Sequence, residues 1–187
     1  IEDLTAQRIA LYSAKPFLGD DPDPRTSTLG WRAIALPELV SFDEDAGQFE
    51  THRITLGIPD LARDAAPEEV FAGEALLEEL NGVAFDKGCF VGQENVSRMK
   101  RRATTRKKFC PLVFAGEPIA FGTPVLAGEA EIGSVRTGLA GRAIALLRLD
   151  RALDAAAAGK PLTAAGREIR LDPPPWLVLP QREDAPG

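Results

Sequence analysis

Short apolar or alternating runs dominate the chain beyond residue 105, and glycine or proline separates most of them. In chain order, these runs are residues 109–114, 123–126, 130–136, 143–149 and 168–171. Strands at this spacing are typical of a compact antiparallel barrel. An alanine-rich run at residues 149–158 predicts one helix, which ends before Gly159 and Pro161. We expect residues 176–180 to pack back on this barrel.

Strand-like runs also occur in the first half of the chain. Residues 9–12 and 31–36 predict two strands, and the turn-rich stretch at residues 19–24 separates them. Moderate alternation predicts a further strand at residues 48–58.

Two helices are predicted in the same half. Pro67 begins a short helical pattern that extends to Leu80. Residues 93–102 predict a second helix with its cations on the outside. The whole pattern therefore indicates an α+β chain.

Composition narrows the class of protein. The 187 residues, 44% of them hydrophobic, suffice for one large or two small domains with a real core. No run of 18 apolar residues is present, so we expect no membrane span. Two cysteines form no disulfide framework, which favours a reducing, cytoplasmic setting. The single histidine, His52, is expected at a surface or strand edge, and it leaves little material for a zinc site.

Positive charge is concentrated in one stretch. The chain carries a net charge of −6, yet residues 98–108 hold seven cations and no acid, which leaves the remainder at −13. So acidic a remainder repels phosphates, and we expect no nucleic-acid binding. A small polyanion fits the stretch better, and a solvated face is equally open.

The octapeptide at residues 87–94 carries the candidate chemistry. Gly88 and Gly92 flank Cys89 and allow φ > 0 or a close approach of the backbone. Lys87, together with a helix beginning near Gln93, would favour a thiolate at Cys89. The alternative is an inert core cysteine. The other cysteine, Cys110, lies in an apolar strand and is expected in the core.

The sequence Lys-Gly-Cys-Phe-Val-Gly-Gln-Glu resembles the signature of the YgfZ family. These proteins are folate-binding relatives of the glycine-cleavage T-protein, an aminomethyltransferase, and they support iron–sulfur cluster maturation. Further pieces in the same order as in that family are residues 23–25, 29–32, 53–59, 80–86 and 96–99. Leu76 and Glu78 depart from it, since they stand where the family usually has Asn and Asp.

The resemblance implies a fold and a division of the chain. Residues 1–104 would form part of a T-protein-like folate-binding domain, an antiparallel sheet with helices. Residues 105–180 would form a small antiparallel β-barrel domain, followed by a tail at residues 181–187. The chain would then be the C-terminal part of a longer protein.

The resemblance also implies a function. The protein would be a tetrahydrofolate-binding accessory factor that assists assembly or repair of iron–sulfur clusters in partner or client proteins, without a tightly bound metal of its own. Cys89 would be a reactive thiol with Lys87 beside it. The remaining candidate residues are Gly88, Phe90, Gly92, Gln93 and Glu94 in the motif, and Arg25, Trp31, Arg32, Glu74 and Arg98 for folate. Trp31 would stack on the pterin or belong to the core.

Two other functions remain open at this point. One is a folate-dependent aminomethyltransferase, although T-proteins carry their catalytic acid in a preceding part and lack this octapeptide. The other is a structural module in which the octapeptide only builds a turn. Two cysteines are too few to hold an iron–sulfur cluster alone, since clusters need about four thiolates. We therefore do not expect a typical enzyme.

Overall fold

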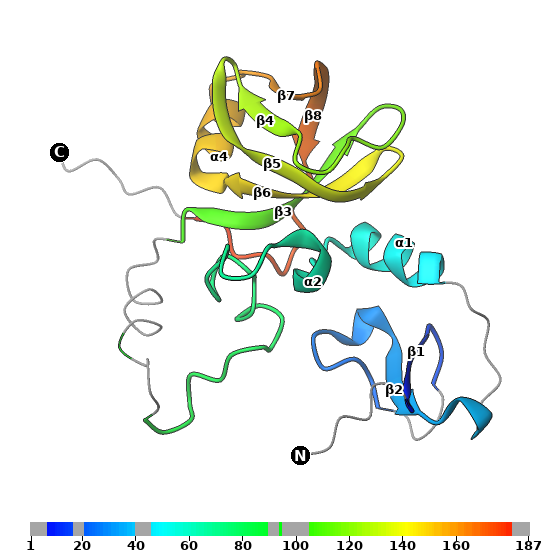
Figure 1. The fold of residues 1–187 in the computed structure, drawn as a ribbon. Coiled ribbons are helices and arrows are strands. Elements are labelled where there is room, and N and C mark those ends of the chain that lie inside the picture. Colours follow the sequence, from blue (N-terminus) through cyan, green and yellow to red (C-terminus); the bar gives the residue numbers. More distant parts are fainter. Residues whose placement is uncertain (1–6, 17–20, 40–45, 90–93, 95–104, 181–187) are drawn as a thin grey trace.

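A closed six-stranded barrel and a separate two-stranded sheet make up the described strands of this computed structural model. The structure describes residues 7–16, 21–39, 46–89, 94 and 105–180. Helix α1 (Ala46–Leu56) and the short helix α2 (Leu61–Asp64) lie between the barrel and the sheet (Figure 1). The order of these parts confirms the predicted α+β fold with a small antiparallel barrel.

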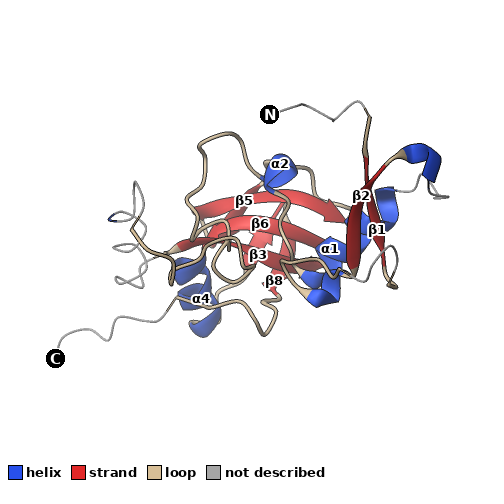
Figure 2. Cartoon of the chain, turned by 90° about the horizontal axis from the view of Figure 1, so that it is seen from below, coloured by secondary structure: helices blue, strands red, loops and turns tan. Residues whose placement is uncertain are grey.

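The barrel strands follow one another in the order β3-β6-β5-β4-β7-β8, and every neighbouring pair is antiparallel. Their bounds are β3 (Lys107–Phe114), β4 (Pro124–Ala127), β5 (Ala130–Leu139), β6 (Arg142–Arg148), β7 (Leu162–Ala164) and β8 (Arg167–Leu171). Helix α4 (Leu149–Ala157) follows β6 directly and covers one side of the barrel (Figures 1 and 2). The five predicted strands and the predicted helix are all present.

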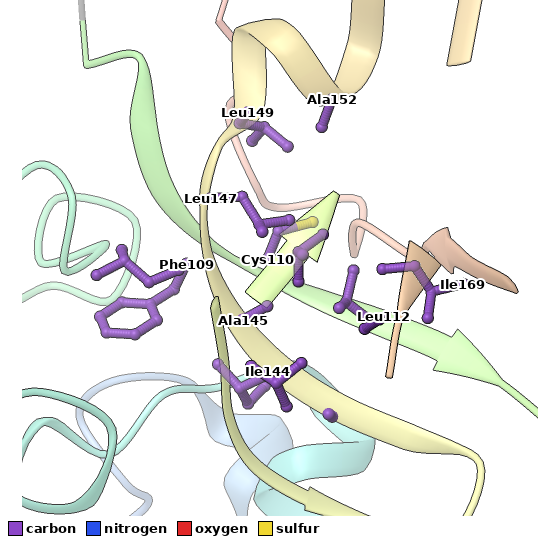
Figure 3. Close-up of a cluster of buried hydrophobic side chains, with 14 of the residues drawn as sticks. Phe109, Cys110, Leu112, Ile144, Ala145, Leu147, Leu149, Ala152 and Ile169 are labelled. Atoms are coloured by element: carbon purple, nitrogen blue, oxygen red, sulfur yellow. The ribbon is translucent and has the colours of Figure 1, made fainter. Parts of the chain in front are cut away.

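Strands β3 and β6 are buried on both faces. Successive side chains of a strand point to opposite faces. Accordingly, Cys110 and Leu112 lie with Leu147 on one side, and Phe109 lies on the other (Figure 3). Phe109 also donates its backbone N–H to the carbonyl of Glu74, at 3.1 Å. Both strands therefore read as nearly continuous apolar runs.

Strand β7 is the barrel strand that the sequence pattern did not predict. It is three residues long, and a two-residue turn joins it to β8. Both turn residues, Ala165 and Gly166, have positive φ, at 51° and 71°. This combination is typical of a type I′ hairpin. Alanine is an uncommon residue in the first turn position, so the usual Asn-Gly or Asp-Gly signal is absent.

The two-stranded sheet consists of β1 (Ile9–Ser13) and β2 (Trp31–Ala35), which pair antiparallel. Both strands were predicted. The connection between them contains a 3₁₀ turn, Ser27–Leu29, whose last residue is fully buried. A second 3₁₀ turn, Pro37–Leu39, follows β2.

The predicted strand at residues 48–58 is wrong, because α1 occupies most of this range. The buried positions of the helix are Arg53 and Ile54, with Phe49 and Leu56 partly buried. One of these is a charged residue, so the apolar stripe of a helix is incomplete in the sequence. His52 consequently lies on a helix and not at a strand edge.

The predicted helix at residues 67–80 is also wrong. This stretch forms a chain of hydrogen-bonded turns. Glu68 and Leu76 have φ values of 63° and 59°, which no right-handed helix accommodates. Leu76 is fully buried, so its packing against the core outweighs the helical preference of the sequence.

Residues 176–180 pack back on the barrel as expected. Leu177 is buried, and the carbonyl of Val178 accepts a hydrogen bond from Lys108 Nζ at 2.9 Å. Most of the predicted helix at residues 93–102, and the predicted tail at 181–187, lie outside the described residues. The predicted division of the chain between residues 104 and 105 stays a prediction.

Candidate functional site

Cys89 is exposed, whereas Cys110 is fully buried. Burial is the main cause that raises the pKa of the Cys110 thiol to about 12, and the charge of Asp172 adds to it. The prediction that Cys110 is a core residue is therefore confirmed. An inert core position for Cys89, the alternative considered above, is wrong. Cys89 is the one thiol of this chain that a partner or reagent can reach directly.

The described part of the octapeptide comprises residues 87–89 and 94, and all four residues are exposed. Gly88 does not use the positive φ that glycine allows, and a Cβ added there would meet no atom of the described residues within 4 Å. The backbone at this glycine is thus neither left-handed nor in close contact with other residues that the structure describes. Phe90, Gly92 and Gln93 lie outside the described residues.

The segments before and after the octapeptide contact each other at residues 73–79 and 105–109. Glu79 accepts a hydrogen bond from Lys108 Nζ at 2.6 Å, and the side chains are only 5% and 10% exposed. The backbone bond from Phe109 to Glu74 lies beside this pair in sequence. A Cβ at Gly73 would stand 2.9 Å from Thr105 Oγ1. These contacts hold residues 73–79 against residues 105–109. We call this pair the stem, because the segment that carries Cys89 begins and ends there.

Glu74, a candidate folate ligand, serves the backbone of this stem. Its Oε2 accepts a hydrogen bond from the N–H of Phe71 at 2.9 Å, and its carbonyl accepts the bond from Phe109. These contacts stabilise turns that have no regular helical bonding. Glu74 thus has a local structural role, which the sequence comparison alone did not indicate.

Asp23 and its two arginines form a polar cluster before β2. Asp23 is 4% exposed, and Arg25 binds it with Nη2 at 2.7 Å and Nε at 2.9 Å. Arg32 Nε lies 3.8 Å from the same carboxylate, and its side chain is 54% exposed. Burial alone would raise the pKa of Asp23, but hydrogen bonds from Arg25 and the charges of both arginines lower it below the usual value. Arg25 is therefore occupied internally, and Arg32 is the more accessible cation.

The segment that contains this cluster lies against the start of the cysteine segment. Asn81 Nδ2 donates to the carbonyls of Pro24 and Arg25 at 3.2 and 3.3 Å. His52 Nε2 lies 2.8 Å from the carbonyl of Thr28. The structure thus brings residues 24 and 25 next to Asn81, although 57 and 56 positions separate them from it in the chain. Trp31 is partly buried, and its role in stacking on a pterin stays a prediction.

The motif at residues 53–59 has a role that sequence reasoning did not identify. Arg53 is fully buried, and its guanidinium binds Glu50, Asp64 and Thr137. Asp64 is also fully buried and accepts a bond from Thr137 Oγ1 at 2.6 Å. Because Thr137 belongs to β5, these contacts fasten α1 and α2 to the barrel.

The glycine of the same motif is a close-packing position. Gly57 has a φ of 77°, and a Cβ there would lie 2.4 Å from Pro111 Cγ in β3. Only glycine combines this backbone conformation with such a close approach. The spacing of Arg53, Gly57 and Pro59 is the signal by which this junction can be found in a sequence.

The basic stretch is only partly described. Arg98 lies outside the described residues, as do its neighbours to residue 104. Lys108 is buried and paired with Glu79, so this cation belongs neither to a solvated face nor to a ligand-facing patch. Within the described ranges, no group of three or more His, Cys, Asp or Glu side chains could hold a metal ion. No described helix is long and apolar enough to cross a membrane.

Comparison with known families identifies the barrel. Residues 106–179 match the sequence model of the CAF17 C-terminal β-barrel domain. This barrel is a CAF17-type C-terminal domain. The match covers all six strands and the helix between β6 and β7.

Relatives of known name extend the similarity beyond the CAF17-type barrel. The human and mouse proteins named iron–sulfur cluster assembly factor IBA57, mitochondrial, are each 33% identical over 135 and 138 residues. Both alignments cover 67% of this chain but only 38% of the relative. A homologue from Mycosarcoma maydis is 34% identical over 104 residues, 51% of this chain and 26% of its own length. These findings support the expected family at the level of the CAF17-type barrel and the IBA57 relatives. Membership of the YgfZ branch stays a prediction.

Proposed function

We propose that this chain is part of a tetrahydrofolate-binding accessory protein that assists the assembly or repair of iron–sulfur clusters in other proteins. The observation that carries the proposal is the similarity to the human and mouse IBA57 proteins, whose names describe them as iron–sulfur cluster assembly factors. The chain spans 38% of the length of these relatives, so the activity of the whole protein is inferred.

Cys89 is the residue to which we assign the chemistry. It is exposed, and the segment that carries it begins and ends at a stem with buried contacts. Because Cys110 is buried, this chain can offer a cluster only one thiolate, and a partner protein would supply the others. Cys89 would therefore act as a transient ligand or exchange with a partner thiol, with Lys87 close in sequence.

Folate would bind near residues 23–32 and the start of the cysteine segment. The contacts of Asn81 with the carbonyls of residues 24 and 25 support this location, because they bring the two predicted parts of the site together. Arg32 is the better candidate for a folate carboxylate, since Arg25 already binds Asp23. Trp31 would contact the pterin with its exposed part.

A folate-dependent aminomethyltransferase is the weaker alternative. The names of the relatives describe assembly factors and not transferases. A transfer assay with an aminomethyl-lipoyl substrate and tetrahydrofolate distinguishes the two, and turnover by the complete protein would favour the enzyme.

The cytoplasm remains the proposed location of this protein. Two free cysteines suit any reducing compartment. The relatives carry the word mitochondrial in their names, which describes those proteins. Cell fractionation with an antibody to the complete protein tests the location.

The central experiment is complementation in a strain that lacks the native protein. The complete protein should restore the activity of iron–sulfur enzymes, and Cys89→Ala should fail to do so at equal abundance. Asp86→Asn, another exposed change in the same segment, is the matched control and should restore it. Full complementation by Cys89→Ala would refute the role of the thiol.

A fluorescence titration with tetrahydrofolate tests the ligand separately, and absence of saturable binding at micromolar concentrations would refute folate binding.

A further inference from the structure

Arg136 on β5 is a buried cation whose hydrogen bonding is incomplete. Its side chain is 9% exposed, and both terminal nitrogens bind the carboxylate of Glu69, Nη1 at 3.2 Å. Its Nε–H is buried and has no acceptor among the described residues. A buried donor without a partner is rare in folded proteins and costs stability. The guanidinium therefore retains one donor that Glu69 does not satisfy.

Glu69 is held in an arrangement that prevents it from reaching this donor. Its Oε2 also accepts a hydrogen bond from the N–H of Ala66 at 2.8 Å. The preceding residue, Glu68, has a φ of 63°, a backbone conformation that residues other than glycine, asparagine and aspartate seldom adopt. The carboxylate consequently meets the end of the guanidinium and leaves its Nε side unused. A carboxylate without this tether could bind Nε and one terminal nitrogen together.

One side of the guanidinium faces an aromatic ring that is largely exposed. The ring of Phe121 lies next to Arg136, and its centroid is 5.3 Å from Cζ of the guanidinium. Phe121 is 57% exposed. Aromatic side chains beside an arginine are typical of the energetically important parts of binding surfaces. Phe121 is therefore an exposed aromatic ring in contact with the guanidinium.

We propose that Arg136 is a binding site for an external carboxylate that carries an apolar group beside it, and that Glu69 occupies this site in the isolated chain. The ligand replaces Glu69, binds the Nε side of the guanidinium, and places its apolar group against Phe121. This site is distinct from Cys89 and from residues 23–32, so it does not depend on the function proposed above. The carboxylate belongs either to a small acid or to an acidic side chain of a peptide.

The test follows the side-chain Nε–H resonance of Arg136 by NMR in the complete protein labelled with ¹⁵N-arginine. Arg136→Lys, in which this resonance is missing, assigns it. The probes are 3-phenylpropionate and the peptide acetyl-Phe-Glu-amide, each compared with its neutral amide. Tighter binding of the peptide assigns the natural ligand to a polypeptide, and equal binding assigns it to a small acid.

Glu69→Ala removes the internal occupant and should lower the apparent Kd for either probe about tenfold or more, because the site is then permanently available. Glu69→Gln keeps the volume of the side chain and should change the Kd in the same direction if the alanine variant fails to fold. The matched control is Arg148, which binds Asp150 in a more exposed pair, at 35% and 26% exposure, with Asp150→Ala as the corresponding variant. A saturable shift at Arg136 that is absent with the amides and at Arg148 supports the proposal. No saturable shift in either Glu69 variant, or an equal shift at Arg148, overturns it.

Discussion

The barrel and the segment in front of it are stabilised by different kinds of contact. Within the barrel, aliphatic side chains of β3 and β6 pack on both faces. The preceding segment has apolar contacts with the barrel too, but its fixed points are buried ion pairs, Arg53 with Asp64 and Lys108 with Glu79. Apolar packing is non-directional, whereas a hydrogen-bonded ion pair demands one geometry.

This difference bears on the position of the cysteine segment. Its stem is defined by Lys108 with Glu79 and by the backbone bond from Phe109 to Glu74. Directional contacts of this kind determine where both ends of the segment leave the barrel, which apolar packing alone would leave less defined. We infer that the barrel supplies most of the stability and that the polar junctions supply the placement.

The largest loss of stability is expected when the buried ion pair between Arg53 and Asp64 is broken. Arg53→Met leaves the fully buried Asp64 without its cation, and we expect a loss of about 3–5 kcal/mol in the free energy of unfolding. The measurement is urea unfolding followed by far-UV circular dichroism. Hydrogen exchange should show that α1 and α2 lose protection before the barrel strands do.

Arg63→Met is the matched control for this change. Arg63 pairs with Glu50 and Asp60 from a side chain that is 52% exposed, so its loss should cost less than about 0.5 kcal/mol. Equal effects of the two arginine variants would mean that the buried pair is no stronger a junction than a surface pair.

A cavity in the barrel should act on the whole molecule. Leu147→Ala removes a fully buried side chain of β6, and we expect a loss of about 2–5 kcal/mol. Here, protection from hydrogen exchange should fall in the barrel strands and in α1 together, since α1 rests on the barrel. Val178→Ala, at a side chain that is 63% exposed, is the control and should change stability little. If α1 kept its protection in the Leu147 variant, the helix would not depend on the barrel.

The barrel could be predicted from the sequence because its pattern and its stabilising contacts coincide. Five strands have apolar or alternating runs, and glycine or proline marks their ends. Strand β7 escaped prediction because it has three residues and a turn with alanine in place of asparagine or aspartate.

The helix α1 could not be predicted by the same means, because its buried stripe includes Arg53. Burial of that residue depends on Asp64 and Thr137, which are 11 and 84 residues away in the chain. The sequence singled out Cys89 and residues 23–32 as separate parts of the candidate site, and their functional roles stay predictions. Their connection through Asn81 depends on a left-handed residue, which a hydrophobic pattern does not reveal.

At low pH, the polar cluster before β2 should lose its contribution to the free energy of unfolding. The pKa of Asp23 is lower in the folded chain than in the unfolded chain, so the folded state favours the deprotonated carboxylate. Its contribution to stability is complete above the unfolded pKa, near 4, and is lost as the pH falls through the folded pKa. Asp23→Asn should therefore lose stability near neutral pH and show a smaller decrease between about pH 4 and pH 2 than the parent protein. Parallel pH profiles of urea unfolding would contradict this role for Asp23.

The smallest effect on stability is expected at Cys89, where the comparison between the two regions becomes one between two thiols. Cys89 is exposed and contributes little packing, so Cys89→Ser should change the free energy of unfolding by less than about 0.5 kcal/mol. Cys110 is buried among the barrel side chains, and Cys110→Ser should cost about 1–3 kcal/mol because it places a hydroxyl in an apolar site.

Reactivity should follow the opposite order. With its pKa raised to about 12, the Cys110 thiol is almost entirely protonated near pH 8, and burial also blocks the reagent. Iodoacetamide labelling read by mass spectrometry should modify Cys89 first, and Cys110 only when urea unfolds the barrel. Labelling of Cys110 at the same rate in the folded protein would mean that the barrel opens readily, and the contrast between a rigid barrel and an accessible cysteine segment would then not hold.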